Sequence, residues 1–97
     1  MRRDEALRLL ASYRQDLAER FGVSSLALFG SVARDEAGSE SDVDLLVEFR
    51  DTPGLSEYMQ VKFWLEERLG RPVDLVMKGA LKPWAEPVVE AEAIRVA

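Results

Sequence analysis

Cysteine and histidine are both absent from the chain. Their absence excludes disulfides, zinc sites built from thiolate or imidazole ligands, cysteine nucleophiles and any Ser-His-Asp triad. A metal ion would have to be held by oxygen ligands, which favours Mg²⁺ or Mn²⁺. A general base would have to be a carboxylate, a lysine or a tyrosine.

The sequence also lacks a long apolar run and an excess of positive charge. No segment approaches the ~20 apolar residues of a membrane helix, and no signal-peptide core follows the N-terminus. We therefore expect a cytoplasmic protein that is not associated with membranes. The 13 Lys and Arg residues are outnumbered by 18 Asp and Glu, for a net charge of −5. This charge argues against binding free nucleic acid but is compatible with a small nucleotide that carries its own cation.

The remaining composition, 47% hydrophobic and 32% charged, is typical of one soluble globular domain over residues 1–97. Hydrophobic periodicity predicts helices at 4–20, 31–36, 56–69 and 84–92, and strands at 25–29, 42–49 and 73–77. Residues 38–41 are expected to form a turn, and 93–97 either a packed tail or a further strand. The predicted class is α/β (α+β), with helices packed on a small mixed β-sheet.

Asp42 and Asp44 stand one residue apart at the start of the second predicted strand. Alternate strand residues point to the same face, so their Cα atoms would lie roughly 6.6 Å apart at ~3.3 Å per residue. Two carboxylates so placed suit one or two divalent cations, since two-metal sites hold their ions about 3.5–4 Å apart. The alternative is that Asp42 is a turn residue and Asp44 faces solvent.

Asp74 lies inside the third predicted strand. If this strand neighbours the second with its apolar residues on the same core side, Asp74 joins Asp42 and Asp44 on the opposite face. We call these three residues the acidic triad and expect them to bind metal. Asp74 would also accept the proton of an attacking hydroxyl. A solvent-facing aspartate is again the alternative.

Gly30 and Ser31 follow the first predicted strand, and ten residues separate Ser31 from Asp42. Glycine lets the backbone approach a ligand closely, and a helix with Ser31 as its N-cap would direct free N–H groups at an anion. Arg34, one turn further on, could reach a phosphate as readily as solvent. An ordinary strand-to-helix turn is the alternative, but the spacing to Asp42 favours a nucleotide site.

These segments together resemble a known signature. Residues 30–34 (Gly-Ser-Val-Ala-Arg) and 41–45 (Ser-Asp-Val-Asp-Leu) resemble the pattern of the DNA polymerase beta-like nucleotidyltransferase superfamily. The chain length and element order are similar to those of its minimal nucleotidyltransferase (MNT) branch, and residues 73–76 match the segment with the family's third carboxylate. The resemblance implies transfer of a nucleoside monophosphate, usually AMP from ATP, to a hydroxyl with release of pyrophosphate.

The resemblance assigns roles to individual residues. Gly30 and Ser31 would bind the triphosphate. Asp42 and Asp44 would hold two Mg²⁺ ions, and Asp74 would complete the triad. One departure is Asp35, which stands where the pattern often has glycine.

The resemblance also implies a partner. Minimal members are often encoded beside a HEPN-domain toxin, and some act as antitoxins by adenylylating a toxin tyrosine. Without the added helical domain of larger relatives, the site would be completed by such a protein or by a second copy of the chain. The alternative is a binding module that neutralises its partner by contact alone. A metal-dependent phosphatase or nuclease is disfavoured, because the sequence has neither a phosphoryl-accepting nucleophile motif nor a basic track.

Overall fold

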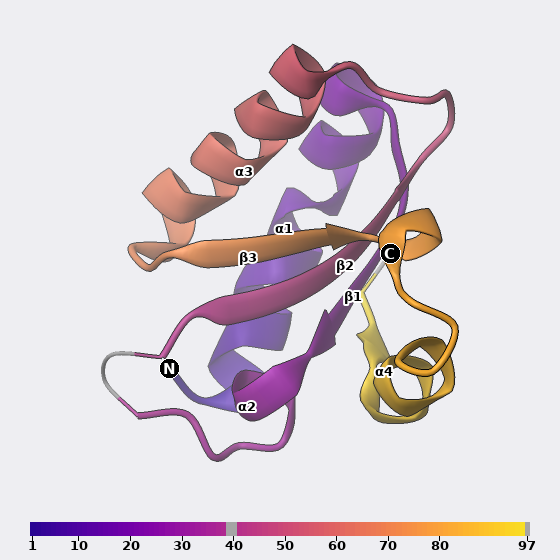
Figure 1. Cartoon of the computed structure of the whole chain (residues 1–97). Coiled ribbons are helices and arrows are strands. Elements are labelled where there is room, and N and C mark those ends of the chain that lie inside the picture. The colour runs from indigo at the N-terminus through magenta and orange to yellow at the C-terminus, as the bar shows by residue number, and fades with distance from the viewer. Residues whose placement is uncertain (39–40, 97) are drawn as a thin grey trace.

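The computed structural model describes residues 1–38 and 41–96, which form helices packed on one mixed four-stranded sheet (Figure 1). The elements in chain order are α1 (Arg3–Phe21), β1 (Val23–Phe29), α2 (Gly30–Ala33), β2 (Val43–Phe49), α3 (Leu55–Leu69), β3 (Val73–Met77), η1 (Lys78–Ala80), α4 (Glu86–Glu92) and β4 (Ile94–Arg95). The strand order is β3-β2-β1-β4. β1 pairs antiparallel with β2 and β4, whereas β2 and β3 run parallel. The predicted α/β (α+β) class is confirmed.

The two long helices bury the apolar stripes that their periodicity predicts. α1 buries Ala6, Leu10 and Leu17, and α3 buries residues at matching helical spacing that include Leu65. Each helix ends at a glycine in the left-handed conformation, with φ of 70° at Gly22 and 69° at Gly70. None of the helices in the described part of the chain is long and apolar enough to span a membrane.

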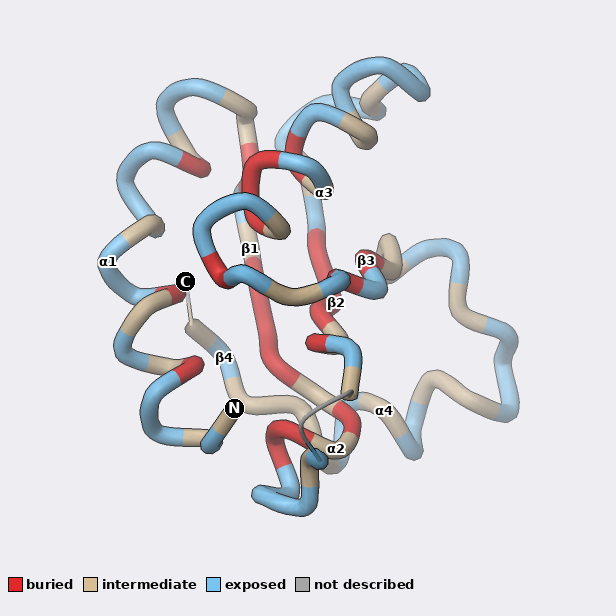
Figure 2. Tube along the Cα trace, turned by 90° about the vertical axis from the view of Figure 1, so that its left-hand side faces the viewer, coloured by how far each residue is buried: buried red, intermediate tan, exposed pale blue. Residues whose placement is uncertain are grey.

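Residues along β2 point alternately to the core and to the opposite face of the sheet. Val43, Leu45 and Val47 are fully buried, whereas Asp44 and Glu48 on the other face keep solvent exposure. Figure 2 shows α1 on one side of the strands and α4 on the other. We call the face away from α1 the outer face. Acidic residues of β2 therefore lie on the outer face because hydrophobic residues at alternate positions fill the core.

The short helix after β1 differs from the prediction. It spans Gly30–Ala33 rather than 31–36, and its N-cap is Phe29, so the assignment of Ser31 as the N-cap was wrong. The chain turns one residue early because Gly30 adopts a φ of +74°. Asp35, with φ of 60°, takes up the left-handed conformation that suits the glycine often found there in the family pattern, and its Oδ1 accepts a hydrogen bond from the Arg3 N–H at 3.0 Å.

The remaining boundaries shift by a few residues. Asp42 immediately precedes β2 instead of opening it, and α4 begins at Glu86 rather than at residue 84. The segment 94–95 pairs with β1, which confirms the strand alternative for the tail. Residues 39 and 40 of the predicted turn 38–41, and residue 97 of the predicted tail, lie outside the described residues.

Candidate functional site

The sheet register brings two members of the acidic triad side by side. Asp44 on β2 and Asp74 on β3 are direct partners in the parallel ladder. Partnered residues of neighbouring strands point to the same face of a sheet, so both carboxylates lie on the outer face. Asp42 stands two residues before Asp44, at the entry to β2. The structure thus places all three members at one end of the same strand pair.

The electrostatic environment of Asp44 is unfavourable for its negative charge. Partial burial raises the pKa of the Asp44 carboxyl above its ordinary value, and the charges of Asp74 and Asp42 raise this pKa further. Arg34 opposes the rise. Three carboxylates that destabilise one another are the oxygen donor set that suits a hard divalent cation. Within residues 1–38 and 41–96, however, no three acidic side chains are already gathered into a metal-binding cluster.

The Gly30–Ser31 turn is packed directly against Asp44. Phe29, the residue before the turn, is the β-ladder partner of Asp44. A Cβ atom built on Gly30 would lie 2.0 Å from the Asp44 Oδ2 atom, so any side chain here would force the Asp44 carboxylate to move. Ser31 follows as the second residue of a four-residue helix and is partly exposed. Such a short helix has little macrodipole, so the turn would bind an anion mainly through its N–H groups.

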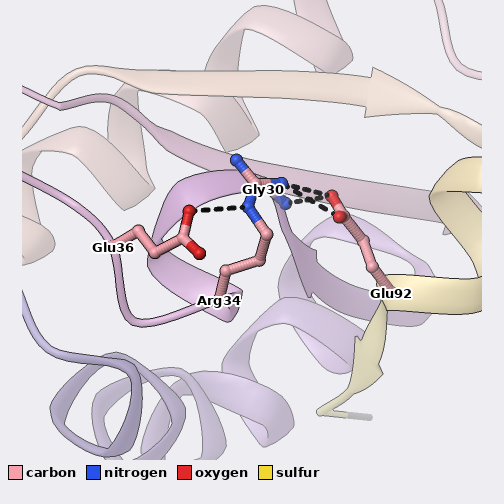
Figure 3. Close-up of polar contacts among 4 residues, drawn as sticks. All are labelled: Gly30, Arg34, Glu36 and Glu92. Carbon is pink, nitrogen blue, oxygen red and sulfur yellow. Dashed lines mark hydrogen bonds and ion pairs between the residues drawn. The ribbon is translucent and has the colours of Figure 1, made fainter.

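A carboxylate from the far end of the chain binds the Gly30 N–H of this turn and the nearby Arg34 (Figure 3). The Gly30 N–H donates to Glu92 Oε1 at 2.8 Å, and Arg34 Nη1 lies 3.2 and 2.9 Å from the two Glu92 carboxylate oxygens. Arg34 Nε also donates to Glu36 Oε2 at 3.3 Å. The Gly30 N–H lowers the pKa of Glu92, and Arg34 adds to this effect. Sequence analysis missed Glu92 because no local pattern connects residues 62 positions apart.

Two contacts from α3 position the strand that carries Asp74. The Glu66 carboxylate accepts a hydrogen bond from the Val73 N–H at 2.9 Å and is held by Lys62 Nζ, also at 2.9 Å. The Tyr58 hydroxyl donates to the Leu75 carbonyl oxygen. The two residues that flank Asp74 are therefore bound to the helix beneath the sheet, which orients the Asp74 side chain outward.

Burial and the neighbouring carboxylates disfavour the Asp44 charge, so removing this charge is expected to stabilise the metal-free protein. The pKa of Asp44 is higher in the folded protein than in the unfolded chain, so the folded state is relatively most stable below the ordinary aspartate pKa. This stability is lost as the pH rises through the raised value, because the folded protein then has to carry the Asp44 charge. We expect the Asp44→Asn variant, at neutral pH in EDTA, to melt a few degrees above the wild type in scanning calorimetry. The matched control is Asp16→Asn on the exposed face of α1, which should leave the melting temperature unchanged. An Asp44→Asn variant that melts below the wild type would contradict this account.

Comparisons with known proteins identify the family. Residues 10–96 match the family model described as a nucleotidyltransferase domain. Protein adenylyltransferase MntA of Thermococcus cleftensis is 41% identical over 93 residues, which cover 96% of this chain and 94% of the relative. A solved structure described as a minimal nucleotidyltransferase has a TM-score of 0.81 and 39% identity, covering 97% of this chain and 95% of that chain.

A more distant solved structure shares the fold alone. A chain from the Shewanella oneidensis complex of a tri-AMPylated HEPN toxin with an MNT antitoxin gives a TM-score of 0.68 at 19% identity, covering 94% of this chain and 71% of that chain. The family model and the two similar relatives cover nearly the whole sequence, including the Gly30–Ser31 turn and the acidic triad. The chain therefore belongs to the nucleotidyltransferase domain family and is a nucleotidyltransferase of the minimal type.

Proposed function

We propose that this chain transfers AMP from ATP to a hydroxyl group of a partner protein and releases pyrophosphate. The observation that carries the proposal is the direct pairing of Asp44 with Asp74, next to a glycine turn that touches Asp44. This arrangement puts carboxylates for metal binding beside backbone donors for phosphate. The Thermococcus relative is named as an adenylyltransferase that acts on protein, which supports the same class of acceptor.

The proposed roles follow from these positions. Asp42 and Asp44 would hold two Mg²⁺ ions, for which Mn²⁺ could substitute, with Asp74 as a further ligand. The Gly30 N–H, Ser31 and Arg34 would receive the triphosphate of ATP. Bound Mg²⁺ would neutralise charge that develops on the phosphates. The repulsion that raises the pKa of Asp44 would be relieved by such cations, which supports this use of the acidic triad.

In the proposed reaction the acceptor oxygen forms a bond to the α-phosphorus as the bond between that phosphorus and the bridging oxygen breaks. Pyrophosphate leaves with the bridging oxygen, and the acceptor proton passes to the Asp74 carboxylate. Asp74 suits this role because it is exposed on the outer face, where an acceptor could reach it. Nearby Asp44 is partly buried and suits metal binding better.

We further propose that the acceptor is a tyrosine of a HEPN-domain toxin and that the chain is its antitoxin. The fold shared with the Shewanella MNT–HEPN complex supports this partner class. The chain also exposes large apolar side chains on and just before α4, the helix whose Glu92 contacts Gly30. Trp84, just before α4, is 74% exposed, and Val88 on α4 is 64% exposed. A protein partner that covers them would bring its hydroxyl to the outer face of the sheet.

The proposal is tested with purified chain, ATP, Mg²⁺ and a HEPN-domain toxin of the proposed partner class. We expect pyrophosphate release and one or more AMP groups on a toxin tyrosine, detected by intact mass and peptide sequencing. EDTA, or Tyr→Phe replacement in the toxin, should abolish incorporation. Toxin that is neutralised without gaining AMP, and that is still neutralised by a chain carrying both Asp42→Asn and Asp44→Asn, would instead establish a contact-only antitoxin.

A further inference from the structure

Glu92 occupies two of the three groups that the proposed function assigns to phosphate, the Gly30 N–H and Arg34. Its carboxylate accepts from the Gly30 N–H at 2.8 Å and pairs with Arg34 Nη1 at 2.9 Å. A carboxylate held by a backbone N–H and by two contacts from one guanidinium nitrogen uses the same donors that a phosphate group would use. Figure 3 shows the Glu92 side chain reaching from α4 to both residues.

Glu92 and a triphosphate cannot use these donors together. Both are anions, and the Gly30 N–H has a single hydrogen to donate. The Glu92 charge also adds to the repulsion that raises the pKa of Asp44, which places Glu92 within electrostatic range of the acidic triad. A nucleotide that enters this site therefore has to displace the Glu92 carboxylate first.

The element that carries Glu92 is weakly attached to the rest of the fold. Every residue of α4, all of them within the described part of the chain, is at least partly exposed. The helix is seven residues long and is followed by the two-residue strand β4. Besides Glu92, the helix residue Glu90 forms an ion pair with Lys78, with Lys78 Nζ 3.2 Å from the Glu90 carboxylate. Because α4 contributes little to the core, it can move away without unfolding the sheet.

We propose that Glu92 is a built-in substitute for substrate phosphate, which holds the Gly30–Ser31 turn and Arg34 in place until ATP displaces it and α4 swings aside. The inference rests on the proposed function, because it concerns the phosphate site of that reaction. The apparent dissociation constant for ATP is then the intrinsic constant divided by the fraction of molecules in which Glu92 is detached from the turn. The same contact keeps Arg34 positioned when no nucleotide is present.

The test measures binding rather than turnover. The ligand is an ATP analogue with a methylene group between the α and β phosphorus atoms, supplied with Mg²⁺ and titrated into the chain in a calorimeter. Neutralising Glu92 as Glu92→Gln should lower the dissociation constant about tenfold. Glu86→Gln removes a charge of the same sign from the start of the same helix, away from the turn, so its dissociation constant should match that of the wild type.

A Glu92→Gln variant that binds the analogue no more tightly than the wild type would overturn the inference. So would equal gains in Glu92→Gln and Glu86→Gln, because the effect would then come from the general charge of α4. If the chain binds the analogue but transfers no AMP from ATP to any partner, the proposed reaction alone is refuted. If neither the wild type nor Glu92→Gln binds the analogue, both the proposed function and this inference are refuted.

A second measurement uses the wild-type chain and does not depend on the variant folding. Hydrogen exchange of the α4 amides should accelerate when the analogue and Mg²⁺ saturate the protein, because the helix loses its attachment to Gly30 and Arg34. Exchange in α3 serves as the internal reference and should not change. Unchanged or slower exchange in α4 would show that nucleotide does not displace the helix, which also overturns the inference.

Discussion

Asp44→Asn is expected to reduce AMP transfer at least about a thousandfold, the largest effect of any single substitution in the outer face. The asparagine keeps the size of the side chain but removes the charge that lies across the strand pair from Asp74 and two residues after Asp42. A loss of this size corresponds to about 4 kcal/mol of transition-state stabilisation at 1.36 kcal/mol per tenfold change. Loss of a carboxylate that would hold Mg²⁺ beside the reacting phosphates would account for such a deficit.

The measurement is the initial rate of AMP incorporation at saturating ATP and Mg²⁺, with the melting temperature of each protein recorded beside it. The variant is expected to be the more stable protein in EDTA, so its inactivity cannot be attributed to unfolding. Asp16→Asn on α1 is the matched control and should retain full activity. A rate for Asp44→Asn within tenfold of the wild type would mean that the acidic triad is not the catalytic centre.

Gly30→Ala is expected to damage both the fold and the reaction. The residue has a φ of +74°, a conformation that costs a residue with a Cβ atom about 1–2 kcal/mol. The new methyl group would also start 2.0 Å from the Asp44 carboxylate, and overpacking of this kind costs about 1–3 kcal/mol more. Together these costs lower the free energy of unfolding by about 2–5 kcal/mol, measured by urea denaturation.

Gly70→Ala separates the two contributions. Gly70 has nearly the same φ, +69°, but nothing lies within 4 Å of a Cβ atom built on it. This variant should therefore lose only the conformational part, about 1–2 kcal/mol, and keep its activity. If the two alanine variants were equally stable and equally active, the close contact between Gly30 and Asp44 would have no energetic or functional importance.

The placement of Asp44 and Asp74 on one face of the sheet was predictable because local rules determine it. Val43, Leu45 and Val47 alternate with polar residues, so burying them in the core necessarily sends Asp44 to the outer face. The same alternation in Val73 and Leu75 sends Asp74 outward. Once the two strands pair in parallel with both apolar sets on the core side, the carboxylates share a face whatever the loop between them does.

The features that were not predicted depend on distant parts of the chain. The start of α2 at Gly30 reflects close packing against Asp44, which the residues around Ser31 do not encode by themselves. Glu92 reaches Gly30 and Arg34 because β4 pairs with β1 and so returns the C-terminal segment to the sheet. Neither the pairing nor the contact has a periodic signal, since both depend on the three-dimensional arrangement of segments far apart in sequence.

The position of β3 has a consequence for folding as well as for chemistry. β3 is the outermost strand of the described sheet, on the side opposite β4. An edge strand exposes a row of backbone groups to other chains, and a charged side chain on a short edge strand discourages pairing between molecules. Asp74 provides such a charge in a strand of only five residues. Its replacement by an apolar residue would therefore promote self-association through sheet edges, in addition to any loss of catalysis.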